Sequence, residues 1–519
     1  MAAAGADLDG KSAVVGEDGV RREFATRLGH PAPLWMLFMS EFWERFAFYG
    51  IRWAMVLYVV AQFYGGQGSG EKPANELYGA YLGLVYAGAI FGGYVADKLI
   101  GHQRSILLGA LIMSVGLFTI AIPNETVFHI GLATIIVGNG LFKPIISTLV
   151  GRLYAQSDER RDSGFTIFYM GINLGALVSP LVTQYLATKI FGVDNMPAYR
   201  VVFIASGVGM LLSLVWFWFG RKRLQGIGLP QAAQAGMRNV LVVVALGVLV
   251  GIPMFYFLLS IDAMYLQIIL MLLLVGPAFM LAAEGFREGH VARDKVFAMI
   301  IILAFNVFFW CFFEQAGSSF NFLADKIVDR DIGMHGMFLA LAGESNFPVS
   351  WFQSVNSVAI IALAPVIAWI WIRMGRANPT IPRKFSIGLV FNALAFLLLM
   401  YTLTHLIAPD TGKIPFWTLV MVYVLQSTGE LCLSPIGLSM TTKLAPPKLA
   451  GFAMGAYFLS IAIGDNLSGI FAGAASGEGG LTTTSALGAF TQGFWILLVA
   501  GAVLFAISPF VNRLMHGTK

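Results

Sequence analysis

The chain has 519 residues, of which 57% are hydrophobic and only 12% are charged. A soluble globular protein of this size does not need so much apolar surface, so the composition excludes that class and indicates a membrane protein with many spans. The formal net charge of +5 does not indicate a nucleic-acid partner, because the basic residues lie in short segments between apolar runs rather than in one patch.

Fourteen apolar segments are long enough, at about 20 residues or more, to cross a bilayer. They group as six, two and six, and we therefore expect an all-α membrane protein. The segments lie at about 34–64, 77–99, 104–122, 127–151, 163–187, 199–220, 238–258, 263–284, 296–323, 349–374, 384–405, 416–442, 450–474 and 488–514.

The distribution of basic residues orients these segments. If the N-terminus is cytosolic, 24 of the 33 Lys and Arg residues lie in cytosolic segments, six on the other side, and three within spans: Arg45, Arg52 and Lys143. This bias follows the positive-inside rule and predicts that both termini are cytosolic. The first 30 or so residues lack an apolar core with a cleavage site, so we expect residues 1–33 to form a cytosolic tail rather than a signal peptide.

The first apolar segment contains an unusual charged stretch, Glu41–Arg52. In a helix, positions 41, 44, 45, 48, 49 and 52 share one face, which carries two carboxylates and two guanidiniums. Each charge near the centre of a span costs about 2.5–3.5 kcal/mol, so these groups are expected to pair and to face a polar cavity. A cluster of ion pairs that serves packing alone is the alternative.

A second motif follows the second apolar segment, from Gly93 to Arg104. Its glycines allow close helix contact, and Asp97 is placed to cap a neighbouring helix or to pair with Arg104. This pattern is similar to the loop motif of the major facilitator superfamily, and we assign Asp97 and Arg104 to gating. An ordinary tight cytosolic turn is the alternative reading.

Further motifs cover both halves of the chain. They are Glu41-x-x-Glu44-Arg45-Phe46, Gly140–Pro144, Phe165–Gly175, Phe312–Gln315, Phe347–Asn356 and Gly429–Leu438. Together they resemble the proton-dependent oligopeptide transporter (POT) family of the major facilitator superfamily, and the extra hairpin resembles its bacterial members. The departures are Phe48 in place of a tyrosine, Tyr457 where some relatives have tryptophan, and no histidine in the second span.

The resemblance implies the fold of that superfamily, with 14 transmembrane helices. The N-terminal six-helix bundle is expected at 34–220 and the C-terminal bundle at 291–514. A linker at 221–290 contributes the two inserted helices, and a short cytosolic tail at 515–519 ends the chain. The location that the resemblance implies is the bacterial inner membrane, with no cofactor.

A di- or tripeptide is a zwitterion, and its receptor needs a cation, an anion and amide partners. Arg52 and Lys143 are intramembrane cations suited to the peptide carboxylate, and the resemblance implies that Glu430 binds the amino group. It also implies the remaining substrate contacts, which are Asn173, Asn356, Tyr49, Tyr86, Trp310 and Tyr457. The structural alternatives are a snorkelling Lys143, a Glu430 paired only with Lys143, and asparagines that merely join helices.

Uphill transport needs an energy source, and the sequence has no Walker loop for nucleotide binding. Carboxylates beside arginines favour proton coupling, which we assign to Glu41, Glu44, Arg45 and Glu314. We expect Glu314 to form a salt bridge with Arg52 that protonation weakens.

Two other functions stay open from sequence. The same scaffold would suit a carrier of a non-peptide anion such as nitrate or an organic acid, although such a carrier has little use for Glu430. An enzyme is not expected, because the seven histidines lie in loops or near span ends, without a catalytic constellation at mid-membrane depth. The expected partners are therefore di- and tripeptides, protons and the lipid bilayer, while Asp465 and Asn466 receive no role.

Overall fold

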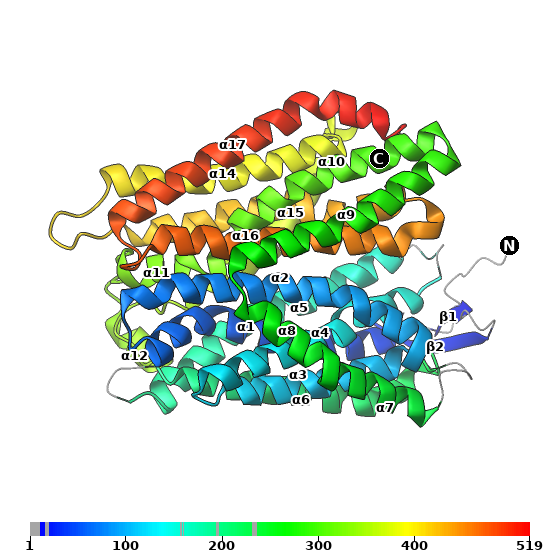
Figure 1. Ribbon diagram of the computed structural model, residues 1–519, viewed down its shortest axis with the longest axis horizontal. Helices are drawn as coiled ribbons and strands as arrows, with labels where there is room; N and C mark the ends of the chain where they lie inside the picture. The colour runs from blue at the N-terminus through cyan, green and yellow to red at the C-terminus, as the bar shows by residue number, and fades with distance from the viewer. Residues whose placement is uncertain are drawn as a thin grey trace. The chain divides into compact units, whose positions relative to one another are not determined.

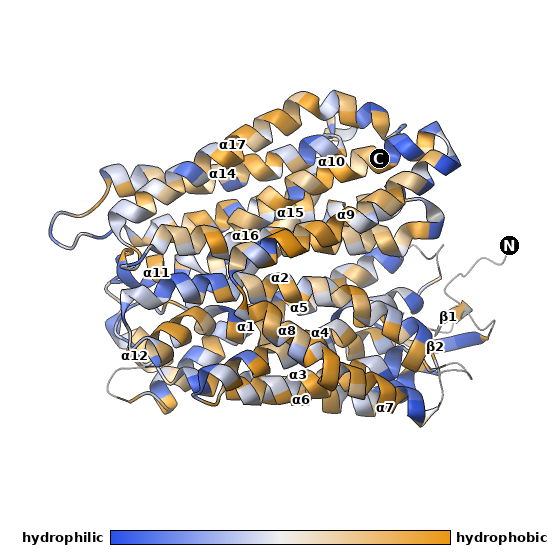
Figure 2. Cartoon of the chain, viewed as in Figure 1, coloured by the Kyte–Doolittle hydropathy of each residue, from blue (hydrophilic) through white to orange (hydrophobic). Residues whose placement is uncertain are grey.

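The computed structural model describes residues 11–15, 20–155, 158, 160–193, 197–230 and 236–518. Within these residues, fourteen helical segments are long and apolar enough to cross a membrane. Each matches one of the segments expected from sequence, so the prediction of fourteen spans is confirmed. Figure 2 shows why apolar runs in the sequence predicted the spans. Hydrophobic residues lie along the helices, and hydrophilic residues lie mainly at their ends.

The chain forms two compact units. Unit 1 takes the described residues of Met1–Arg52, Gly88–Ala187 and Pro197–Ser260. Unit 2 takes those of Trp53–Ala87, Thr188–Met196 and Ile261–Lys519. The first two long helices thus contribute to both units, and the two inserted helices fall into different ones. The bundle boundaries expected from sequence stay a prediction.

Two helices that are divided between the units come first along the chain (Figure 1). They are α1 (Ala32–Phe63) and α2 (Glu71–Val95), joined through the short turn η1 (Gly68–Gly70). The other elements of unit 1 are η2 (Ala96–Ile100), α3 (His102–Ile120), α4 (Glu125–Arg152), α5 (Arg160–Tyr185), α6 (Tyr199–Gly220), η4 (Arg221–Leu224), α7 (Met237–Leu246), η6 (Gly247–Gly251) and α8 (Ile252–Ser260).

Glycines allow the helices of unit 1 to approach closely, as is common where helices pack in membranes. A Cβ atom added to Gly109 of α3 would lie 2.7 Å from the carbonyl oxygen of Gly138 on α4. A Cβ atom on Gly138 would lie 2.6 Å from the backbone nitrogen of Met113. Neither position has room for a side chain, so these two glycines set the spacing of α3 and α4.

A small antiparallel sheet precedes the first helix, which the sequence analysis did not predict. Its strands are β1 (Lys11–Val15), β2 (Arg21–Arg27) and β3 (His30–Pro31). Leu28 and Gly29 turn the chain between β2 and β3 with φ values of 51° and 79°, the two-residue turn that suits a hairpin. Gln225, just after η4, donates from Nε2 to the carbonyl of Glu23 at 2.7 Å, which ties the sheet to unit 1. The first ten residues of the expected tail lie outside the described residues.

Unit 2 contains the rest of the described helices. They are η3 (Leu186–Ile190, shared with unit 1), α9 (Ala263–Glu288), α10 (His290–Phe313), η7 (Glu314–Gly317), α11 (Ser319–Lys326), α12 (His335–Leu341), α13 (Trp351–Met374), η8 (Gly375–Ala377), α14 (Ile381–His405), α15 (Phe416–Leu444), η9 (Pro447–Leu449), α16 (Ala450–Ser476) and α17 (Thr483–Leu514).

Buried amides join the helices of unit 2. Gln426 of α15 donates from Nε2 to Oδ1 of Asn392 on α14 and to the carbonyl of Phe312 on α10, both at 3.0 Å. Asn306 of α10 donates to Oγ of Ser460 on α16 at 2.9 Å. α14 and α17 lie side by side along their lengths (Figure 1). The amide nitrogens of Gln426 and Asn306 thus find acceptors inside the protein, as apolar surroundings require.

Candidate functional site

Unit 1 carries a buried ion-pair cluster on the charged face of α1. Arg45 contacts the carboxylate of Glu44, and its Nε lies 3.4 Å from Oε1 of Glu41, one helical turn away. All three side chains are buried. Asn139 of α4 adds a hydrogen bond from Nδ2 to Oε1 of Glu44 at 3.5 Å. The predicted pairing is confirmed for these three charges, while the polar cavity that they were expected to face stays a prediction. Sharing one guanidinium between two carboxylates reduces the free-energy cost of burying them.

The ring of Phe48 lies close to two cations of unit 1. Its centroid is 4.8 Å from Cζ of Arg45 and 5.8 Å from Nζ of Lys143 on α4. At these distances the negative face of an aromatic ring attracts a cation. The sequence analysis treated Phe48 only as the loss of a hydroxyl. The structure shows in addition that its ring is close to both cations.

The other expected substrate-binding residues of unit 1 lie on two helices, α1 and α5. Arg52 is buried on α1, with its Cζ 5.4 Å from the ring centroid of Tyr49. Asn173 of α5 is buried and donates from Nδ2 to the carbonyl of Tyr169, one turn earlier in its own helix, at 3.1 Å. Arg52 and Lys143, like Arg45, therefore lie next to aromatic rings in the membrane spans of unit 1.

In unit 2, Glu314 lies where the α-helix α10 gives way to a 3₁₀ turn. α10 ends at Phe313, and Glu314 opens the 3₁₀ turn η7. Tyr78, on the part of α2 that belongs to unit 2, donates from its hydroxyl to Oε2 of Glu314 at 3.5 Å. A side chain at Gly317 would collide with the Tyr78 ring, so the glycine makes room for this approach. A neutral donor thus meets a buried carboxylate at the end of an intramembrane helix.

Glu430 of α15 is held by a neighbouring helix. Asn356 of α13 donates from Nδ2 to Oε2 of Glu430 at 3.2 Å and to Oγ of Ser427 at 2.9 Å. Ser427 in turn donates to the carbonyl of Tyr423 at 2.7 Å. Asn356 and Glu430, which sequence analysis named separately, are therefore direct partners, and Ser427 is a third member that it missed.

The expected pocket aromatics of unit 2 are partly fixed by polar contacts. Trp310 donates from Nε1 to Oδ1 of Asn306 at 3.2 Å. The rings of Tyr86 and Phe458 stack with centroids 6.3 Å apart, and Tyr457 packs edge-on against the same Phe458 ring at 5.9 Å. Tyr86 and Tyr457 thus share one aromatic neighbour, while Trp310 is oriented by an amide.

The comparisons with known proteins agree with this architecture. The family model described as the POT family matches residues 103–479, well over half of the chain. The chain belongs to the POT family. It is 33% identical over 500 residues to the uncharacterized transporter YclF of Bacillus subtilis (strain 168), covering 94% of this chain and 96% of the relative.

Other POT-family relatives cover the chain equally well. The peptide transporter YePEPT of Yersinia enterocolitica subsp. palearctica serotype O:3 (strain YE-P4) is 33% identical, over 95% of this chain and 97% of its own. A crystal structure of a peptide transporter POT in complex with sulfate superposes with a TM-score of 0.79 at 32% identity, over 95% of this chain and 97% of that one. The fold of the major facilitator superfamily expected from sequence is confirmed, and the protein is a multi-pass membrane transporter.

The loop motif of this POT-family member contains a partner that sequence analysis overlooked. Oδ1 of Asp97 lies 3.1 Å from Nε2 of His102, which is buried. The neighbouring Gln103 donates from its backbone nitrogen to the carbonyl of Gly228 at 2.9 Å. The loop is thus held by the linker before α7. The gating role of Asp97 with Arg104 stays a prediction.

A second group missed from sequence lies where α2 begins, in unit 2 of the transporter. Glu71 is buried, contacts Nζ of Lys326 at the end of α11, and accepts a hydrogen bond from the backbone nitrogen of Leu481 at 2.7 Å. One turn later, Asn75 donates to Oγ of Ser476 at 3.2 Å. The only signal in the sequence was an acidic residue opening an apolar helix, which is common at helix starts.

Asn466, which had no role from sequence, joins the second inserted helix, α9, to α16 within unit 2. Its Nδ2 donates to Oε1 of Gln267 on α9 at 2.9 Å and to the carbonyl of Ala263 at 3.0 Å. Both side chains are buried. Asn466 of α16 is therefore a structural residue of this transporter.

Proposed function

We propose that this protein is a symporter that imports di- and tripeptides together with protons by alternating access. The observation that carries the proposal is the distribution of opposite charges between the units. Unit 1 holds the intramembrane cations Arg52 and Lys143, and unit 2 holds the half-buried Glu430 bonded to Asn356. A zwitterion presents a complementary charge to each. The relatives named as peptide transporters support the same substrate class.

In this proposal the peptide is held by its two ends. Arg52 and Lys143 bind the carboxylate, since a guanidinium and an ammonium donate several strong hydrogen bonds to such a group. Glu430 binds the amino group, positioned by the amide of Asn356. Asn173 and Asn356 bond the peptide backbone. The remaining lining residues, which tolerate varied side chains, are Tyr49, Tyr86, Trp310 and Tyr457.

Proton coupling is assigned to two places. Protonation of Glu314 weakens a salt bridge with Arg52 and frees Arg52 for the substrate carboxylate. The Glu41–Glu44–Arg45 cluster supplies further titratable groups on α1. A membrane potential of 100 mV contributes about 2.3 kcal/mol per charge moved, and a pH unit adds about 1.4 kcal/mol. One proton therefore supports a substantial accumulation ratio.

Alternating access also requires contacts that form and break. Within unit 2, the bonds of Glu71 with Lys326 and Leu481 join the start of α2 to the end of α11 and to the segment before α17. Asp97 and Arg104 serve the opposite, cytosolic end. With both termini in the cytosol, as the basic residues predict, this orientation places the Glu71 contacts on the outer face of a bacterial inner membrane.

The test is uptake of labelled dialanine into proteoliposomes under an imposed inward proton gradient. We expect accumulation above the outside concentration, abolished by a protonophore. Arg52→Ala and Glu430→Ala are each expected to remove dipeptide binding. Uptake of nitrate or an organic acid that dialanine does not compete with would contradict the assignment of peptides as substrates. Tight dipeptide binding in both variants would contradict the proposal that the protein binds the peptide by its two termini.

A further inference from the structure

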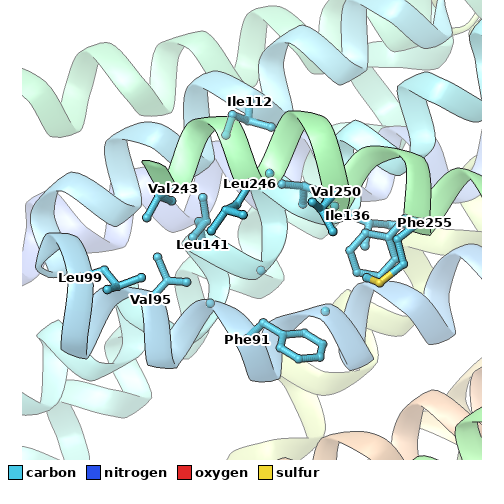
Figure 3. Close-up of a pocket in the computed structure, with 17 residues that line it drawn as sticks. Phe91, Val95, Leu99, Ile112, Ile136, Leu141, Val243, Leu246, Val250 and Phe255 are labelled. Carbon is cyan, nitrogen blue, oxygen red and sulfur yellow. The ribbon is translucent and has the colours of Figure 1, made fainter. Parts of the chain in front are cut away.

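A groove runs along the first inserted helix of unit 1 (Figure 3). It has a volume of about 340 Å³ and is lined by residues of α2, η2, α3, α4 and the continuous segment α7–η6–α8. Every lining residue is apolar or glycine. A cavity of this size lies within the range of about 300–1,000 Å³ typical of ligand pockets.

Glycines and a helix irregularity create the groove. The segment Gly247–Gly251 forms a π-helical turn between α7 and α8, a local widening often found at functional sites. Both glycines line the groove, as do Gly88, Gly92 and Gly140 on the opposite wall. The inserted helix therefore rests on α4 through small residues, while larger side chains such as Leu246 and Val250 border the space that is left (Figure 3).

The groove opens to the bilayer rather than to water. Leu246 and Val250 are 53% and 55% exposed, and Phe91 on α2 is 62% exposed, all within membrane spans. Atoms that line a void lose their attractive contacts on one side. In a membrane the surrounding solvent is acyl chain, so an acyl chain is the occupant that restores those contacts.

The chain at one end of the groove carries charged residues, which are Asp97, paired with His102, and two basic residues. Leu99 is a lining residue, and its carbonyl accepts a hydrogen bond from Nδ2 of Asn239 at 3.2 Å, which brings the start of α7 to η2. The neighbours of these two residues are Lys98 and Arg238, and both side chains are exposed. The positive-inside orientation puts this end at the cytosolic surface, where basic pockets between helices bind anionic headgroups.

We propose that this groove binds one anionic phospholipid of the cytosolic leaflet. One acyl chain lies between α7–η6–α8 and α2, and the phosphate lies between Lys98 and Arg238. The apolar groove accepts the chain of any phospholipid, so the two cations supply the selectivity for net negative charge. In this proposal the first inserted helix forms one wall of a lipid-binding site.

Native mass spectrometry of the purified full chain tests the proposal, with phosphatidylglycerol and phosphatidylcholine titrated separately. The wild type is expected to bind one phosphatidylglycerol with clear preference. In the Lys98→Ala/Arg238→Ala double variant, phosphatidylglycerol affinity is expected to fall about thirtyfold while phosphatidylcholine affinity stays unchanged. Leu246→Trp, which fills the groove, is expected to weaken both lipids.

Matched controls are Arg376→Ala, an exposed arginine in another short helix, and Leu241→Trp, on an exposed site of α7 outside the groove. Neither is expected to change lipid binding. Val250→Trp replaces Leu246→Trp if the latter lowers the melting temperature. Unchanged phosphatidylglycerol preference in the double variant overturns the proposal, as does full displacement of the lipid by inorganic phosphate alone.

Discussion

Two pairs of carboxylates within membrane spans, one pair in each unit, are held by different kinds of donor. In unit 1, Glu41 and Glu44 share the guanidinium of Arg45. In unit 2, Glu314 accepts from the hydroxyl of Tyr78 and Glu430 from the amide of Asn356, and both of these donors are neutral. A cation neutralises a carboxylate, whereas a neutral donor satisfies a lone pair and leaves the charge. In the proposed function, Glu314 takes a proton and Glu430 an ammonium group, whereas Glu71 of the same unit contacts the ammonium of Lys326.

The largest effect on folding stability is expected from removing the cation that Glu41 and Glu44 share, Arg45. Arg45→Ala leaves two buried carboxylates without their shared partner, a change that costs about 3–5 kcal/mol of folding stability. The melting temperature of the purified protein in detergent measures it. Adding Glu44→Gln to the variant is expected to restore part of the loss. If the melting temperature of Arg45→Ala equals that of the exposed control Arg376→Ala, the ion pairs do not stabilise unit 1.

Next in size is a matched pair of carboxylate-to-amide changes. Glu314→Gln is expected to keep the melting temperature and dipeptide counterflow but to lose accumulation driven by a pH gradient, which is about tenfold per pH unit for one coupled proton. Glu44→Gln is expected to lower the melting temperature instead, because it unbalances an ion pair. If proton-driven accumulation persists in Glu314→Gln, Glu314 does not couple transport to protons, and the proposed difference from Glu44 is wrong.

A smaller effect is expected at the two asparagines proposed to contact substrate. Asn356→Ala removes a hydrogen bond to a charged carboxylate, an interaction that contributes about 1.5–3 kcal/mol. Dipeptide affinity is expected to fall roughly tenfold as Glu430 loses its orientation. Asn173→Ala is expected to cost less, since that amide bonds its own helix. Equal losses in a binding titration would show that Asn356 does not act through Glu430.

The smallest effect concerns a titratable group of unit 1 outside the spans. Nδ1 of His30 lies 2.9 Å from the Tyr154 hydroxyl, and burial, with the nearby Arg160 guanidinium, lowers the pKa of His30 below its usual 6.5. Because the folded state then binds fewer protons, the stabilisation is complete above about pH 6.5 and is lost as the pH falls through the lowered value.

The melting temperature between pH 7.5 and pH 5.5 measures this contribution, and His30→Gln is expected to flatten that part of the profile slightly. The variant also separates histidine titration from carboxylate titration in any pH profile of transport. A profile unaffected by the substitution would mean that His30 does not report on the fold in this range.

Sequence alone determined the features that depend on neighbouring residues. Fourteen spans follow from runs of apolar residues, because crossing a membrane is a property of consecutive positions. The pairing of Arg45 with Glu41 and Glu44 follows from helical spacing within one turn. The motifs also carried the family, which the whole-chain comparisons confirmed.

Only the tertiary structure decided which distant positions meet. Asn356 reaches Glu430 across 74 positions, Asn466 reaches Gln267 across 199, and Lys326 reaches Glu71 across 255. Membrane helices are apolar on most faces, so hydrophobic periodicity does not select the face that meets a neighbour. The partners were set instead by close packing and by the need to satisfy each buried polar group, and both depend on the whole fold.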